Sequence, residues 1–151
     1  MKIITGENNK ILRSKSQPVK KIDAKTKSLV SEMKKIIERH DGVGLAAIQV
    51  GIPLRIVVCK IDDKFYSFIN PEIVKFFSKK IIMEEGCLSL PGVTGEVERP
   101  EKISVKALTE NNKILKIKVF GLLARILQHE IDHLDGILFI DKAKNIKNKP
   151  A

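Results

Sequence analysis

The residues best suited to chemistry lie in segment 129–133, which reads HEIDH. His129 and His133 are four positions apart, so on a helix both imidazoles share one face and can bind the same metal ion. Glu130 lies next to the first histidine and can act on a metal-activated water without binding the metal itself. We therefore predict a metal-dependent hydrolytic centre on a helix, with a chance match in an unrelated helix as the alternative.

A catalytic site of this kind needs a third protein ligand. The residues after His133 contain no glutamate and no further histidine, and Phe139 stands where one HExxH class has its third histidine. The third ligand is therefore expected upstream, where His40 and Cys87 are candidates. Cys87 is favoured because a thiolate binds zinc and ferrous iron strongly and segment 84–92 is bounded by glycines. His40 ends a predicted helix, where a histidine can simply interact with the helix dipole.

Two predicted helices contain the two histidine-bearing segments. The first covers about residues 24–40, with apolar residues at helical spacing and Asp23 as its N-cap. The second begins near Gly121 and ends at Asp135-Gly136, with HExxH inside it. Residues 1–22 have no such periodicity and are predicted to form an irregular arm.

Four segments have the β-branched and alternating composition of strands. Residues 103–108 and 114–119 are separated by the turn-forming sequence TENN and are predicted to form a hairpin. Residues 54–59 and 65–69 form the other two, and Asn70-Pro71 is expected to end the last of these. Strands outnumber helices and do not alternate with them one for one, which favours an α+β fold. We expect antiparallel strands packed around the central HExxH helix, plus an N-terminal helix.

The composition is that of one globular domain with 151 residues and a net charge of +10. We predict a catalytic domain at 1–142 and a short basic tail at 143–151. Scattered lysines and an aromatic content of only 5% argue against sequence-specific DNA binding and leave a weak attraction to ribosomal RNA. The N-terminus has no apolar signal region and the chain has no membrane-spanning apolar run, so a cytoplasmic location is expected. Cys59 lies in a hydrophobic strand and is predicted to be a buried structural thiol.

Three segments together resemble a known family. Residues 42–49 read GVGLAAIQ, residues 85–89 read EGCLS, and residues 129–133 read HEIDH. They resemble, in order and spacing, the GφGφAAxQ, EGCφS and HExDH motifs of peptide deformylases, where φ is apolar. Weaker similarities extend the resemblance over about residues 3–142. Ile48 departs from the proline that is frequent at that position in relatives, but its neighbours Ala47 and Gln49 are kept.

The resemblance implies removal of the formyl group from the N-terminal methionine of nascent polypeptides, with release of formate. It implies one divalent metal ion, ferrous iron in cells, with zinc, nickel or cobalt in preparations. It implies roles as follows: metal ligands Cys87, His129 and His133; general base and acid Glu130; oxyanion donors Gln49 and the Leu88 N–H; substrate-strand contact Gly44; methionine pocket Val43, Met83, Leu122, Ile126 and His129; neighbouring charges Glu85 and Arg99.

Three other functions compete with this one: an HExxH peptidase of another class, a non-catalytic relative that binds peptides or RNA, and a structural zinc protein. The missing downstream ligand disfavours the first. The intact Glu130 and Gln49 disfavour the second, and a set of only three ligands disfavours the third. Some relatives have a long C-terminal helix associated with ribosome binding, whereas residues 142–151 here are short and lysine-rich. We therefore expect any ribosome association to be weak and to depend on diffuse positive charge; no oligomeric state is predicted.

Overall fold

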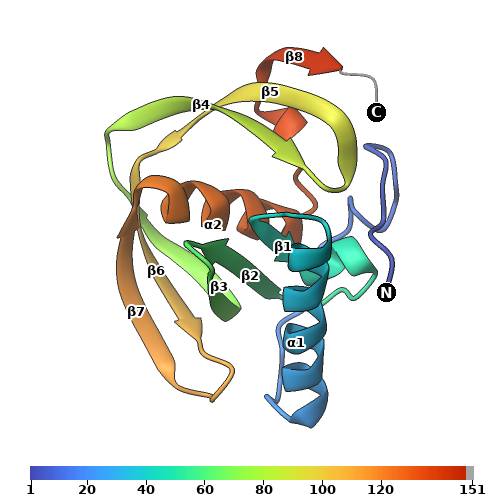
Figure 1. The fold of residues 1–151 in the computed structure, drawn as a ribbon. Coiled ribbons are helices and arrows are strands. Elements are labelled where there is room, and N and C mark those ends of the chain that lie inside the picture. The colour runs from blue at the N-terminus through green and yellow to red at the C-terminus, as the bar shows by residue number, and fades with distance from the viewer. Residues whose placement is uncertain (149–151) are drawn as a thin grey trace.

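The computed structural model describes residues 1–148 and has an α+β fold in which helices and antiparallel sheets form separate layers (Figure 1). The described residues form these elements: α1 (Ala24–Arg39), β1 (Gly44–Ala46), η1 (Ala47–Val50), β2 (Ile56–Ile61), β3 (Lys64–Phe76), β4 (Lys80–Cys87), β5 (Leu90–Pro100), β6 (Lys102–Leu108), β7 (Ile114–Phe120), α2 (Gly121–Leu134), η2 (Phe139–Asp141) and β8 (Lys144–Asn148). Here η denotes a short 3-10 helix. No helix among these is long and apolar enough to cross a membrane.

Helix α1 confirms the first predicted helix. The Asp23 side chain caps it by accepting a hydrogen bond from the Thr26 N–H at 3.1 Å, which satisfies one of the free amides of the first turn. Its apolar residues face the inside and are all buried: Leu29, Val30, Met33, Ile36 and Ile37. They pack with buried residues of β1 and β2, and this contact fixes the helix beside the sheet.

The larger sheet has the strand order β1-β2-β3-β6-β7, with every neighbouring pair antiparallel. The predicted hairpin is confirmed, since β6 and β7 pair from Lys102 opposite Phe120 to Leu108 opposite Ile114. The prediction that Asn70-Pro71 ends a strand is wrong. Asn70 adopts a left-handed conformation with φ 52°, and the pairing with β6 shifts register there, so β3 bends and continues.

The smaller sheet, of order β4-β5-β8, was not predicted from the sequence. Strands β4 and β5 form a long hairpin whose turn is Leu88-Ser89. Within the predicted basic tail, 143–151, residues 144–148 form strand β8, with Val93 of β5 opposite Asn148, and residues 149–151 lie outside the described part of the chain. Every residue of β8 is exposed, so it carries no apolar alternation by which a sequence pattern could reveal it.

Helix α2 lies between the two sheets (Figure 1). It has the predicted limits and ends before Gly136, whose φ of 74° is the left-handed conformation that glycine adopts most readily. Ala124, Ile126, Leu127 and Leu134 pack against the larger sheet in the main core. Because sheets cover both sides of it, polar residues of α2 are also buried, and each needs a partner inside the protein.

Candidate active site

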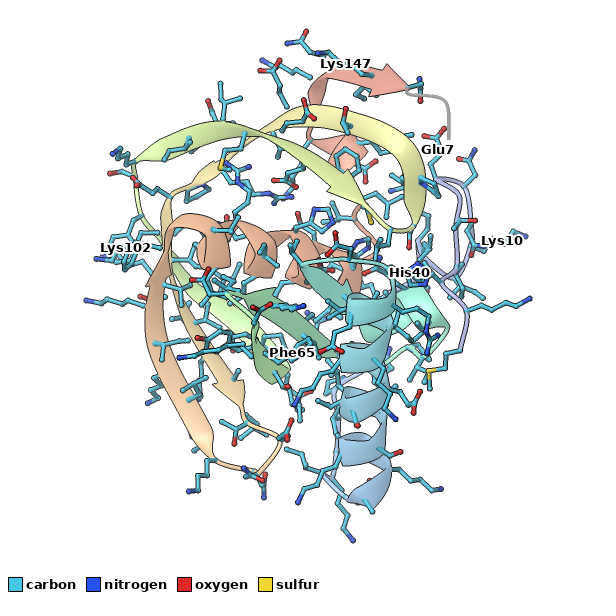
Figure 2. The ribbon with its side chains drawn as sticks, in the orientation of Figure 1. Glu7, Lys10, His40, Phe65, Lys102 and Lys147 are labelled. Carbon is cyan, nitrogen blue, oxygen red and sulfur yellow. The ribbon has the colours of Figure 1, made fainter. Side chains whose placement is uncertain are left out.

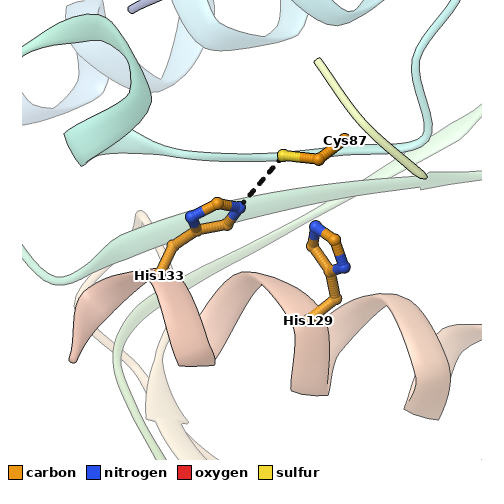
Figure 3. Close-up of side chains that lie close together, drawn as sticks. All are labelled: Cys87, His129 and His133. Atoms are coloured by element: carbon orange, nitrogen blue, oxygen red, sulfur yellow. Dashed lines mark hydrogen bonds between the residues drawn. The ribbon is translucent and has the colours of Figure 1, made fainter. Parts of the chain in front are cut away.

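The structure brings Cys87, His129 and His133 together, although Cys87 lies on β4 and both histidines lie on α2 (Figure 3). One donor atom from each residue lies within 4.8 Å of the others, and Cys87 Sγ lies 3.4 Å from His133 Nε2. His40, the other candidate ligand, is exposed at the end of α1 and is not in this group. Cys59 is fully buried in β2, as predicted.

The electrostatics of this group suit a divalent cation. Burial and the neighbouring His129 lower the pKa of His133 well below its ordinary value, so its ring is neutral and can act as a ligand. Burial opposes a charge on His129, but Glu130, Cys87 and Glu85 outweigh it and raise the pKa of His129. The negative surroundings that favour a proton on the His129 imidazole also favour a metal cation in place of that proton. Two imidazoles and a thiolate form a donor set that zinc and ferrous iron accept.

Two neighbours fix the orientation of His129. Its Nδ1 lies 2.8 Å from Glu85 Oε1, which leaves Nε2 for a metal ion. The Phe139 ring stacks on the imidazole, with centroids 5.9 Å apart and an interplanar angle of 23°. Phe139, which stands where one HExxH class has its third histidine, therefore supports the ring of His129.

The buried carboxylate of Glu85 is held by two arginines. Arg99 donates to both of its oxygens, at 2.6 Å from Nε and 3.0 Å from Nη2, and Arg125 Nη1 donates at 2.7 Å. Burial opposes ionisation of Glu85, but the hydrogen bonds from His129 and Arg99 outweigh it and hold its pKa well below its ordinary value. Glu85 is therefore a fixed anion that accepts the His129 N–H.

Arg125 was missed by the sequence analysis. It lies one helical turn before His129 and donates to the carbonyls of Ile81 on β4 and Val97 on β5, each at 2.7 Å, as well as to Glu85. It therefore joins α2 to both strands of the hairpin that carries Cys87. Its position four residues before the first histidine, on an otherwise apolar face, was the signal available in the sequence.

Gln49 points its amide nitrogen at the ligand group. Its Oε1 accepts from the Ala46 N–H at 2.9 Å, and its Nε2 donates to Ser89 Oγ at 3.0 Å and lies 3.5 Å from Cys87 Sγ. The side chain is 1% exposed, so these contacts fix which way the amide faces. Ser89 was not predicted to contribute, although it lies in the second of the three motifs. Leu88, between Cys87 and Ser89, lies in the β4–β5 turn.

Glu130 lies at the bottom of the site beside Gly44. A Cβ added to Gly44 would lie 2.6 Å from Glu130 Oε2 and 2.8 Å from Ile126 Cγ2, so only glycine leaves room there. Glu130 Oε1 is buried and has no hydrogen-bond partner among the described residues. Burial raises the pKa of Glu130 to about 7, against the opposing charge of His129. The carboxyl group is therefore poised to accept and donate a proton near neutral pH.

A cavity of about 620 Å³ opens above these groups. Its lining includes two of the three predicted metal ligands, Cys87 and His129, together with Glu130 and Gln49. It also includes all the predicted substrate-contact residues: Val43, Gly44, Met83, Leu122 and Ile126. Val43, Met83 and Leu122 are 53%, 42% and 51% exposed, so apolar surface is left open around a polar floor. Glu85 and Arg125 also line the cavity, whereas Arg99 lies behind Glu85.

The fold and site define a hydrolase of the HExxH type, in which a group that could hold a metal ion lies beside a buried carboxyl group, a neutral amide donor and a partly apolar pocket. Comparison with known proteins agrees with this class. The family model described as polypeptide deformylase matches residues 1–149. The peptide deformylase of Syntrophomonas wolfei is 49% identical over 141 residues, which cover 93% of this chain and 91% of that protein.

Solved structures give the same result. A peptide deformylase from Synechococcus elongatus in complex with actinonin has a TM-score of 0.93 at 36% identity, over 96% of this chain and 79% of that one. A Met-Ala-Ser-bound class I type b peptide deformylase from Acinetobacter baumannii has a TM-score of 0.90 at 33% identity, over 94% of this chain and 97% of that one. The chain belongs to the peptide deformylase family, enzymes that remove the formyl group from the N-terminal methionine of nascent polypeptides.

Proposed function

We propose that this protein hydrolyses N-formyl-methionyl polypeptides with Glu130 as its proton-transfer residue and Gln49 as its oxyanion donor. The observation that carries the proposal is that Glu130, the Gln49 amide and two members of the three-ligand group, Cys87 and His129, line the same cavity. The residues given roles here all lie within 1–142.

Cys87, His129 and His133 would hold one divalent ion, and we propose ferrous iron in cells, with zinc, nickel or cobalt accepted by the same donors. When bound, such an ion lowers the pKa of a water ligand to about 7 and so supplies a nucleophile at neutral pH. Glu85 keeps His129 in the tautomer that has Nε2 free, because its carboxylate accepts the hydrogen on Nδ1.

Glu130 first accepts the proton of the attacking water and then delivers it to the leaving amine. Its pKa of about 7 suits both steps, since a group with this pKa holds and releases a proton at neutral pH. The free lone pairs of its buried Oε1 leave the carboxylate available for the water.

Gln49 and Leu88 stabilise the negative charge that develops on the formyl oxygen. Gln49 Nε2 already faces the ligand group, and its other contacts hold it there before substrate arrives. The backbone N–H of Leu88 belongs to the turn next to Cys87 and supplies the second donor. Donors fixed in advance cost no reorganisation during the reaction.

The methionine side chain would occupy the apolar part of the cavity, lined by Val43, Met83, Leu122 and Ile126. The substrate backbone would lie along β1 at Gly44, because β1 is the edge strand of the larger sheet and has a free side. Main-chain recognition tolerates different residues after the first methionine. The tripeptide Met-Ala-Ser bound in the Acinetobacter baumannii relative supports a peptide of this kind as the occupant.

We also propose a weak electrostatic association with the ribosome, supported by the net charge of +10. It should weaken as salt is added, because exposed charges are screened.

Formate release from a formyl-Met tripeptide tests the catalytic proposal, with nickel-loaded protein and the acetyl-Met tripeptide as control. We expect release from the formyl substrate alone. The Glu130→Gln variant should keep its metal and lose nearly all activity, because an amide cannot accept the proton. Full activity in this variant, or no release from wild-type protein that holds one metal ion, would refute the proposed mechanism.

A further inference from the structure

The face of the larger sheet that points away from α2 carries a cluster of lysines. On β6 and β7 the apolar residues Ile103, Val105 and Val119 are buried against α2, so the alternate residues must point outward. The outward set contains Lys102, Lys106, Lys116 and Lys118, and Lys75 on β3 lies opposite Ser104. We call these five lysines the basic face. Figure 2 shows Lys102 on the opposite side of the molecule from Lys10.

Cross-strand pairing concentrates this charge. Lys106 lies directly opposite Lys116. Two residues along the strands, in the neighbouring pair on the same face, Lys118 lies opposite Ser104. Like charges in direct cross-strand positions are unfavourable for a sheet, so stability alone gives no reason for this arrangement. Residues two apart on one strand, such as Lys116 and Lys118, lie about 6.6 Å apart. The lysines therefore form a regular array.

The basic face lacks neutralising partners. Within residues 1–148, no salt bridge involves any of its five lysines, whereas five other lysines form one, among them Lys34 with Glu110 and Lys79 with Glu101. Glu72, opposite Lys106 on β3, is the one acidic residue in register with the array. Two lysines instead lie over the Phe77 ring, with Lys75 Nζ at 4.5 Å and Lys102 Nζ at 4.8 Å from its centroid.

The same surface is hollowed. A groove of about 420 Å³ runs over β3, β6 and β7 and is lined by Lys106, Lys116, Lys118, Ser104, Val74, Val105 and Ile117. Its lining residues include three lysines and a serine, whose ammonium and hydroxyl groups can donate hydrogen bonds to phosphate oxygens. The catalytic cavity contains none of these residues, so the groove is a separate site.

We propose that the basic face binds the phosphodiester backbone of structured RNA. Charge complementarity and the concave shape favour a rod-like polyanion, and lysine, a flexible point charge, contacts phosphates without reading bases. We propose RNA as this polyanion because the proposed function places the enzyme at nascent chains. The choice of RNA therefore rests on the proposed function. The attraction to the ribosome is then localised on β6 and β7 rather than spread over the whole surface.

The test compares two variants with the same change in net charge. Lys106→Glu/Lys116→Glu alters the basic face, and Lys10→Glu/Lys15→Glu alters exposed lysines of the N-terminal arm. The probe is a fluorescein-labelled RNA hairpin, with binding followed by fluorescence anisotropy at several salt concentrations. We expect the first variant to bind roughly tenfold more weakly and the slope of log K against log salt to fall by about 2. The control should stay within about twofold of wild type.

Formate release from the free tripeptide is measured for every variant, and it should be unchanged because neither pair touches the catalytic cavity. It also reports that each variant is folded, and Lys106→Gln/Lys116→Gln repeats the test without introducing negative charge. Equal weakening by both charge reversals, or no binding of the hairpin by wild-type protein, overturns the proposal. Tighter binding to phosphatidylglycerol vesicles than to RNA overturns it in favour of a membrane-facing role. Loss of formate release in wild-type protein with RNA binding intact would count against the catalytic proposal alone.

Discussion

Arg125 Nη1 donates to Glu85 Oε2 at 2.7 Å, while Oε1 of the same carboxylate lies 2.8 Å from Nδ1 of His129. A residue one helical turn from His129 thus holds the carboxylate that orients the His129 imidazole. Arg125 also donates to backbone carbonyls of β4 and β5, so the position of the Cys87 hairpin depends on the same guanidinium.

Replacing Arg125 with methionine should therefore weaken both the fold and the site. Loss of one partner from a buried charged cluster costs roughly 3–5 kcal/mol of unfolding free energy, and Arg99 should keep the loss near the lower end. Metal affinity should fall as well, because His129 is less firmly oriented. Urea unfolding and metal titration measure the two effects. Arg125→Lys is the control and should restore part of the metal affinity; a methionine variant with wild-type metal affinity would contradict this role.

Gln49→Ala should lower kcat about 10²–10³-fold, the usual loss for one oxyanion donor. KM for the formyl-Met tripeptide should change little, because the amide acts mainly on the charge that forms in the transition state. Ser89→Ala is the matched control: it removes the contact that fixes the amide but leaves the donor, so its effect should be smaller. Steady-state kinetics at equal metal content measure kcat and KM for both variants. An equal loss of kcat in Gln49→Ala and Ser89→Ala would show that altered packing, not loss of the donor, lowers the rate.

Gly44→Ala should disrupt the site without a backbone conformational cost. The new Cβ would lie 2.6 Å from Glu130 Oε2 and 2.8 Å from Ile126 Cγ2, so the carboxylate must move. A displacement of about 1 Å at a reacting group can cost about 100-fold in rate. Gly86→Ala is the comparison, since its Cβ would have no neighbour nearer than 3.6 Å. Similar kcat values for Gly44→Ala and wild type would exclude the predicted displacement.

Cys87→Asp should bind metal more weakly and lose most activity, because a carboxylate replaces the thiolate in the ligand group. Cys59→Ala is a control with the same original residue: it costs core packing, but Cys59 lies outside the ligand group and the variant should retain one metal ion per chain. Elemental analysis after gel filtration measures the content. Unchanged metal content and rate in Cys87→Asp would remove Cys87 from the site.

Asp141 should contribute stability that depends on pH. Hydrogen bonds from Arg13, at 2.6 and 3.1 Å, lower the pKa of its carboxyl group below the ordinary value. A lowered pKa in the folded protein means stabilisation above the unfolded pKa of about 3.9 and loss of it as pH falls through the folded pKa. Asp141→Asn should therefore destabilise the protein at pH 7 and much less at pH 3.

Because the Asp141 side chain is 38% exposed, the difference at pH 7 should be below about 1 kcal/mol. Urea unfolding at both pH values gives the comparison, and Asp63→Asn, in a side chain that is 98% exposed, provides the reference. An equal effect of Asp141→Asn at pH 7 and pH 3 would show that its charge is not the cause.

The sequence predicted the elements that have strong periodicity. Helices α1 and α2 and the β6–β7 hairpin have apolar faces and turn or capping residues that mark their limits, and the structure has them nearly where expected. The β4–β5 hairpin was missed because charged, glycine and proline residues interrupt the apolar pattern of its strands and its pairing partners are defined only by the fold. At Asn70-Pro71 a local turn signal was overridden, since β6 continues to pair with β3 beyond it.

The part of the site that lies within the three sequence motifs could be predicted from residue types and spacing. Cys87, His129 and His133 do come together, but the choice between Cys87 and His40 required the three-dimensional fold or the family resemblance. Arg125 and Phe139 act through contacts between distant segments, and although Arg125 has helical spacing from His129, this spacing does not reveal its partners on β4 and β5. The lysine alternation on β6 and β7 was visible, but its concentration on one face depends on the register of the hairpin.

Cys87 and His129 are far apart along the chain and adjacent in space, at the boundary between the β4–β5 hairpin and α2. An ion shared by them would act as a reversible cross-link that closes a long loop. The extended chain does not preassemble such a site, so binding free energy adds to folding free energy. Catalytic competence and resistance to heat or proteolysis would then rise and fall with the supply of one ion, and metal starvation would shorten the lifetime of the protein as well as silence it.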